Sequence, residues 1–104
     1  MAVNYVDDVK KFAPNANEAA VAVIVKYCGI ALTKTDSSLV SCSDPEELGR
    51  VRVGFAFKKL GLDAAAADAG MAKVCTRMKS DKTKSRVTFY YLLAEETGTM
   101  AKLA

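Results

Sequence analysis

The fold class of this chain depends on how residues 44–60, DPEELGRVRVGFAFKKL, are interpreted. The beginning of this stretch is typical of a helix start: Asp44 can cap a helix, Pro45 suits the first helical position, and Glu47 can complete a capping box. Its second half nevertheless alternates polar and apolar side chains like a strand. We predict a helix over 45–60, because a lone strand would have no partner strand elsewhere in the chain.

A helix over residues 45–60 carries its apolar side chains in two stripes, so it needs two packing partners. The stripes are Leu48, Val51 and Phe55 on one side, and Val53, Phe57 and Leu60 on the other. If the other helices cannot cover both, an exposed apolar stripe remains, which is typical of an interface. We therefore expect binding through a helix surface, either to an unknown protein partner or by self-association, most simply as a twofold dimer.

Capping residues, prolines and glycines predict four further helices, over about residues 3–12, 15–28, 64–79 and 83–97. The second begins at Asn15 or Asn17 and is apolar nearly all round, which indicates a central, buried helix. Asp63 caps the third. The fold predicted from this pattern is an all-α, compact bundle of about five helices in a single domain, residues 1–104, with a short turn at 36–39 and a loose tail at 99–104.

The last main helix begins at Thr83 or Ser85 and ends at Gly98. Spacing along it places Phe89, Tyr90 and Leu93 in the core and Tyr91 on its flank. Gly54 and Gly70 lie inside predicted helices, at a cost of about 1 kcal/mol each relative to alanine. We expect close approach of a neighbouring helix at both positions.

The composition excludes several classes of chemistry. The 104 residues include no histidine, which rules out Ser-His, Cys-His and histidine–metal sites, and we expect no metal, cofactor or catalytic site. The three cysteines, Cys28, Cys42 and Cys75, form no CxxC pair. We interpret them as buried free thiols, with Cys42 the most exposed.

The N-terminal segment predicts a cytoplasmic protein without membrane spans. Asp7 and Asp8 stand where a signal peptide would carry positive charge, and no apolar core of a signal peptide follows. The longest apolar run, residues 19–25, is far shorter than the roughly 20 residues that cross a bilayer.

Charge is distributed unevenly along the chain, although the net charge is only +3. Residues 1–49 carry four basic and seven acidic side chains, and the remainder carries eleven basic and five acidic ones. The densest basic cluster lies in 73–86 and comprises Lys73, Arg77, Lys79, Lys82, Lys84 and Arg86. A turn with these cations beside a helix start could bind an anion, so polyanion or nucleic-acid binding is the alternative hypothesis. An ordinary solvated basic loop explains the same pattern.

Five segments together resemble a small bacterial domain of unknown function, number twenty-eight fifty-three. They are residues 8–11, 24–32, 42–46, 59–62 and 84–95, and the last, KSRVTFYYLLAE, is the most specific. The resemblance covers nearly the whole chain. It implies a compact all-helical fold, found mostly in proteobacteria, and supports a helix over 45–60. It implies no activity, cofactor or catalytic residue.

Overall fold

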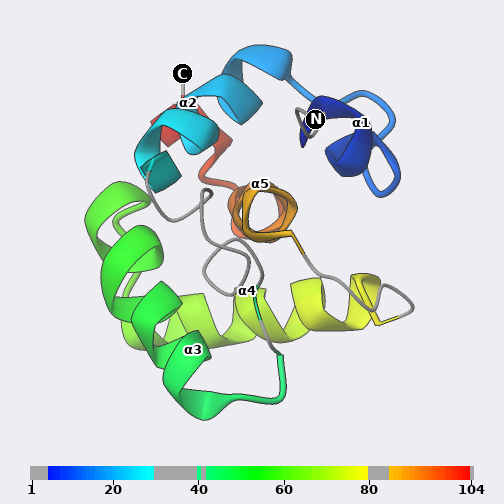
Figure 1. The fold of residues 1–104 in the computed structure, drawn as a ribbon. Helices are drawn as coiled ribbons and strands as arrows, with labels where there is room; N and C mark the ends of the chain where they lie inside the picture. The colour runs from blue at the N-terminus through cyan, green and yellow to red at the C-terminus, as the bar shows by residue number, and fades with distance from the viewer. Residues whose placement is uncertain (1–4, 30–39, 41, 80–84, 104) are drawn as a thin grey trace.

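The computed structural model describes residues 5–29, 40, 42–79 and 85–103, and these confirm the all-α prediction (Figure 1). Within them the chain forms five α-helices, one π-helix and one 3₁₀-helix, and no strand. In chain order the elements are α1 (Tyr5–Lys10), α2 (Glu18–Cys28), α3 (Pro45–Val51), the π-helix η2 (Arg52–Lys59), α4 (Ala64–Arg77), α5 (Arg86–Glu96) and the 3₁₀-helix η3 (Met100–Leu103). The turn predicted at 36–39 lies outside the described residues.

Residues 45–59 are helical throughout, as predicted, but the second half of this stretch is a π-helix. Asp44 Oδ1 accepts the backbone N–H of Glu46 at 3.0 Å, and Pro45 occupies the first turn of α3. The chain then passes directly into η2, where the N–H of Leu60 reaches the carbonyl of Phe55, five residues back, at 3.1 Å. Hydrogen bonds of this longer spacing define a π-helix, a form found frequently at functional sites.

The other helix starts follow the capping residues in the sequence. Asn17 caps α2, and its side chain accepts the N–H groups of Ala19 at 3.0 Å and Ala20 at 3.3 Å. Asp63 caps α4 by accepting the N–H of Ala66 at 2.8 Å. These are local interactions, and a local pattern suffices to predict them.

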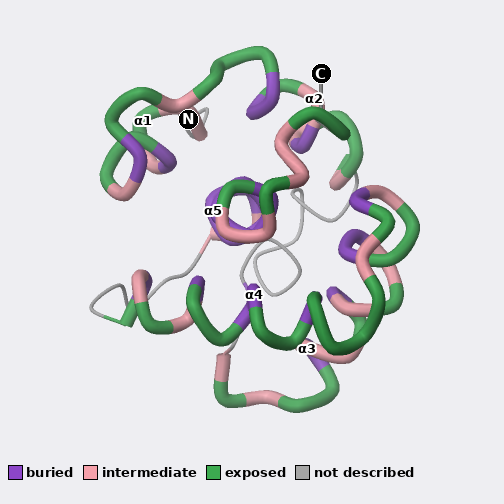
Figure 2. Tube along the Cα trace, turned by 180° about the vertical axis from the view of Figure 1, so that it is seen from behind, coloured by how far each residue is buried: buried purple, intermediate pink, exposed green. Residues whose placement is uncertain are grey.

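The central helix is α5, and the prediction that the second helix is central is wrong. Figure 1 shows α5 end-on in the middle of the molecule, with α1, α2, α3 and α4 arranged around it. Every residue of 87–94 is buried, whereas α2 buries only one face, formed by Ala20, Val21 and Ile24. The large aromatic and leucine side chains of α5 are buried on every side of the helix, whereas the smaller side chains of α2 are buried on one face only. Figure 2 shows the buried turns of α4 facing α5.

Tyr91 is also misplaced by the sequence pattern, which puts it on a flank. It is only 3% exposed, and its hydroxyl accepts the backbone N–H of Asn17 at 2.8 Å. Tyr91 thus links the central helix to the start of α2, over a sequence distance that no local pattern reveals.

The C-terminal segment differs from the loose tail that the sequence predicts. Gly98 adopts a positive φ of 69°, which turns the chain back, and η3 then contacts α2 and α5. The N–H of Thr99 bonds the carbonyl of Ala94 at 2.9 Å, and Met100 packs against the core. Apolar contact therefore holds this part of the tail to the bundle.

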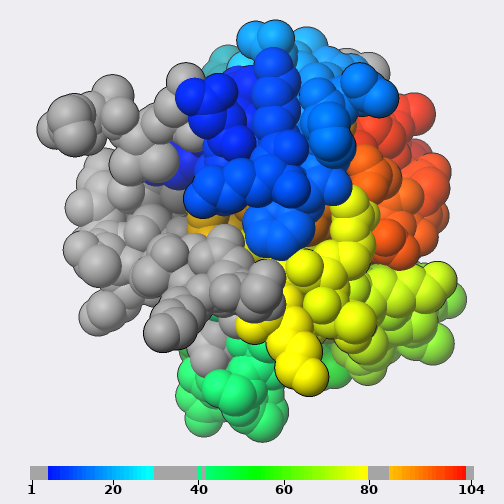
Figure 3. All heavy atoms as spheres, turned by 90° about the vertical axis from the view of Figure 1, so that its right-hand side faces the viewer, coloured from blue at the N-terminus to red at the C-terminus, as the bar shows by residue number. Residues whose placement is uncertain are grey.

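The chain segment after α1 packs beside the C-terminal end of α4 (Figure 3). Arg77 joins the two, because its Nη2 donates to the carbonyl of Phe12 at 2.9 Å and its Nη1 donates to Glu95 at 2.7 Å and Glu96 at 3.0 Å. One guanidinium therefore connects α4, α5 and the segment after α1.

Gly54 and Gly70 provide a matched stability test. A Cβ at Gly70 would lie 2.5 Å from Thr97 Cγ2 and 2.8 Å from Leu93 Cδ1, so the predicted close approach is confirmed there. At Gly54 the expectation is wrong, because no atom of the described residues lies within 4 Å of a Cβ placed there. We expect Gly54→Ala to raise the free energy of unfolding by roughly 0.5–1 kcal/mol and Gly70→Ala to lower it by about 1–2 kcal/mol. Urea titrations followed by circular dichroism measure both, and equal effects of the two changes would contradict the packing at Gly70.

Candidate functional site

An apolar face of η2 is exposed to solvent. Val53 is 59% and Phe57 62% exposed, and they lie four residues apart. Their neighbours Val51, Phe55 and Leu60 are at most 1% exposed. The second predicted stripe is therefore divided: Leu60 enters the core, and Val53 and Phe57 remain outside it.

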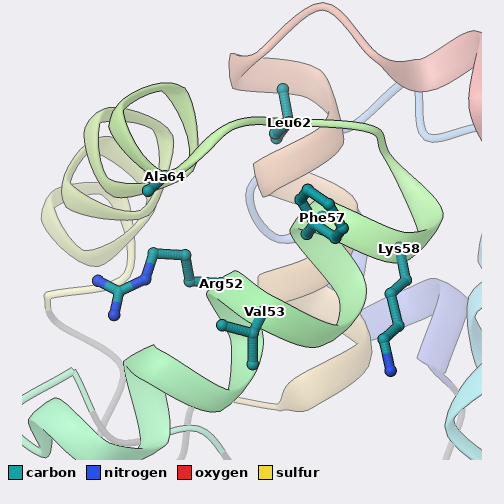
Figure 4. A pocket seen from close by; sticks show the side chains of 6 residues that line it. All are labelled: Arg52, Val53, Phe57, Lys58, Leu62 and Ala64. Carbon is teal, nitrogen blue, oxygen red and sulfur yellow. The ribbon is translucent and has the colours of Figure 1, made fainter.

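These two side chains border a cavity of about 340 Å³, which we call the Phe57 pocket (Figure 4). Leu62, in the link between η2 and α4, and Ala64, at the start of α4, form the rest of the apolar lining. Arg52 and Lys58 complete the wall, and Figure 4 shows them on opposite sides of Val53. The pocket is an apolar hollow between two cations.

The two cations of the Phe57 pocket differ in their ion pairing. Arg52 Nη1 pairs with Asp68 Oδ1 at 3.2 Å, and both side chains are substantially exposed, so this pair contributes little to stability. Lys58 is exposed as well. Among the described residues, the pocket lining includes these two cations and no carboxylate. Because Arg52 is already paired with Asp68, Lys58 is the lining cation that an anionic group of a partner could pair with.

A second cavity, of about 520 Å³, is also lined by Arg52, and we call it the Cys42–Cys75 pocket. Leu48 of α3 and Met71 of α4 supply apolar lining, and the Arg52–Asp68 ion pair also contributes to the wall. Because Arg52 lines both cavities, the two hollows adjoin along the surface between α3, η2 and α4.

Cys42 and Cys75 form a disulfide across 5.9 Å between their Cα atoms, so the prediction of three free thiols is wrong for these two. The pairing joins the segment before α3 to α4, a tertiary contact that an odd number of cysteines without CxxC spacing does not indicate. Cys28 is free and half-buried. Burial raises the pKa of its thiol to about 11, although Arg86 acts to lower it, so the thiol is neutral at physiological pH.

The predicted basic cluster does not converge on one site within the described residues. Arg77 is engaged with Glu95, Glu96 and a backbone carbonyl. Arg86, at the start of α5, donates to Tyr90 Oη at 2.8 Å and to Glu47. Lys73 and Lys79 are exposed, and Lys82 and Lys84 lie outside the described residues. Two of the six cations thus have carboxylate partners inside the protein.

Glu47 has a structural role that sequence reasoning missed. The prediction that it completes a capping box is wrong, because its carboxylate bonds to Arg86 and, at 2.7 Å, to Arg50. Glu47 is only 8% exposed. Burial acts to lower the pKa of Arg86, but Tyr90 and Glu47 outweigh it, and the net shift is upward. The nearby ring of Tyr90 stacks on Phe55 with 4.0 Å between centroids.

The comparison with protein families agrees with this fold. The model of the family described as a protein of unknown function, DUF2853, matches residues 4–101. The chain belongs to this family. No curated protein matches this DUF2853 member. Within its described residues, no helix combines the length and apolar character needed to cross a bilayer.

Proposed function

We propose that this DUF2853 protein is a binding module that contacts a protein partner through the face formed by Val53, Phe57 and the Phe57 pocket. The observation that carries the proposal is Phe57, a large apolar side chain that is 62% exposed at the edge of an apolar hollow. Covering the exposed part of this ring with a partner is worth about 1–2 kcal/mol. Aromatic side chains, phenylalanine among them, are enriched at the buried centres of protein interfaces.

Affinity capture from a bacterial lysate tests this proposal, with the wild-type chain and Phe57→Ser as baits. We expect captured proteins that survive nuclease treatment and are lost with Phe57→Ser. Because Phe57 is exposed, the variant should keep its stability to within about 0.5 kcal/mol, which circular dichroism verifies. Lys73→Ser, an exposed change outside the pocket lining, is the matched control and should capture the same proteins. Capture that is equal with Phe57→Ser would refute the proposal.

Binding of nucleic acid or another polyanion through residues 73–86 is the alternative proposal, and it has less support. Arg77 and Arg86 already bind carboxylates, which leaves Lys73 and Lys79 as the exposed cations among the described members of the cluster. We expect fluorescence anisotropy with duplex DNA and with RNA to show no salt-dependent binding near 0.15 M salt. Binding that weakens steeply with salt and is lost in Lys73→Glu/Lys79→Glu would favour the alternative.

A cytoplasmic location stays a proposal. The Cys42–Cys75 disulfide opposes it, because cytosolic thiols are kept reduced. Fractionation of cells that express the chain naturally tests the location: recovery with a cytoplasmic marker supports it, and recovery with a secreted marker refutes it.

A further inference from the structure

We propose that the partner segment is an acidic peptide with two apolar anchor side chains, one in the Phe57 pocket and one in the Cys42–Cys75 pocket. This inference rests on the proposed function and names the chemistry of the partner. Three observations on the described residues carry it: the arrangement of the two cavities, the size of the exposed apolar face, and the charges beside it.

The arrangement of the cavities favours an extended segment over a compact ligand. The cavities have volumes of about 340 and 520 Å³, and Arg52 lines both. Each volume lies in the range typical of ligand pockets. A ligand that fills both passes Arg52, which pairs with Asp68, and places one apolar group in each cavity. A peptide with two spaced apolar side chains has this form, and a peptide that lays such anchors into an apolar groove is a recurring mode of recognition.

The size of the exposed apolar face favours a peptide over a second copy of the chain. Phe57, at 62% exposed, presents roughly 120 Å² of a side chain of about 200 Å². Val53 adds a smaller area. A stable dimer buries about 800 Å² on each partner. A twofold dimer centred on this face would also bring Arg52 and Lys58 of one copy close to the same cations of the other, which costs free energy.

The charged side chains beside the Phe57 pocket indicate which charge the partner carries. Within the described part of the chain, Arg52 and Lys58 line the Phe57 pocket and no carboxylate does. Asp63 caps α4 and Asp68 pairs with Arg52, so neither is bonded to Lys58. An Asp or Glu beside the apolar anchor of the peptide would therefore pair with Lys58 or with the free side of Arg52.

Selection from a random peptide display library on the full chain tests this inference, with Phe57→Ser as the parallel bait. We expect the enriched peptides to combine two apolar residues with Asp or Glu. For a synthetic copy of an enriched peptide, Phe57→Ser should weaken Kd by more than about 10-fold. Lys58→Glu should weaken it by roughly 3–10-fold, with a reduced dependence on salt. Lys73→Glu makes the same charge change outside the pocket lining and should alter Kd by less than about 2-fold.

The outcomes separate this inference from the proposed function. Enriched peptides that need Phe57 but are neutral or basic would contradict the acidic character of the partner. They would still support the proposed binding face around Phe57. Peptides that bind Phe57→Ser as well as the wild type would overturn both. If the library yields no enriched peptide, or if light scattering at micromolar concentration gives twice the 11.1 kDa mass, the peptide inference is wrong. The affinity capture with the wild-type chain and Phe57→Ser then tests the proposed function independently of the peptide inference.

Discussion

Replacement of Glu47 by leucine is expected to lower the free energy of unfolding by about 3–5 kcal/mol. Glu47 is 8% exposed, and its carboxylate bonds to Arg86, whose side chain is 12% exposed. Loss of the carboxylate removes the Glu47 counter-charge from a largely buried guanidinium, and Arg86 cannot compensate by shedding its proton, because an arginine side chain stays protonated in proteins. Urea denaturation followed by circular dichroism measures the loss.

Two further variants show whether the ion pair causes this loss. Glu46→Leu makes the same change at an exposed neighbour in the first turn of α3 and should cost less than about 1 kcal/mol. Glu47→Leu combined with Arg86→Met removes both charges and should recover much of the stability lost in the single variant. Equal losses in Glu46→Leu and Glu47→Leu would contradict a buried Glu47–Arg86 pair.

Loss of the Cys42–Cys75 disulfide is expected to have the second largest effect. The bridge spans 33 residues, and the chain-entropy estimate for a loop of this length is about 3–4 kcal/mol. The free energy of unfolding of Cys42→Ser/Cys75→Ser should therefore be lower by about this amount, and its urea midpoint should be lower as well. Cys28→Ser, which leaves the bridge intact, should change the stability much less.

A thiol assay provides an independent check of the same bridge. Unfolded without reductant, the chain should expose one thiol, that of Cys28. In the folded protein this thiol should react slowly with alkylating reagents at neutral pH, because its pKa of about 11 keeps the thiolate scarce. Three reactive thiols in the unfolded, unreduced chain would contradict the disulfide.

Much of the fold could be predicted because its signals are local. Asn17, Asp44 and Asp63 each cap a helix through hydrogen bonds to residues two or three positions ahead, and such patterns can be recognised in a single sequence. The π-helix could not be predicted, because the alternating pattern of residues 50–57 only poses the choice between a helix and a strand and carries no sign of the longer hydrogen-bond spacing.

Long-range contacts explain most of the errors. Glu47 meets the capping-box pattern, yet it turns inward to Arg86, which is 39 residues away. The central place of α5 depends on which helices surround it, and Tyr91 is buried because the start of α2 lies over it. Tertiary interactions of this kind override local propensity and leave no trace in residue spacing.

The candidate site was only partly visible in the sequence. From the two apolar stripes over 45–60 we expected an exposed stripe only if the other helices could not cover both, and Val53 and Phe57 are exposed. The pattern could not show that Leu60 leaves its stripe for the core, or that Leu62 and Ala64 close a pocket beside Phe57. The basic cluster is the strongest charge signal in the sequence, yet Arg77 and Arg86 serve contacts within the protein.

The central claim is that the face around Phe57 is a binding site, and fragment binding observed by NMR tests it most directly. Methyl spectra of the ¹³C-labelled chain would be recorded with a library of small aromatic fragments. We predict that the largest shift changes fall on the methyl groups of Val53 and Leu62, and that they vanish in Phe57→Ser. Fragments that perturb other methyl groups most strongly, or that act equally on Phe57→Ser, would contradict the claim.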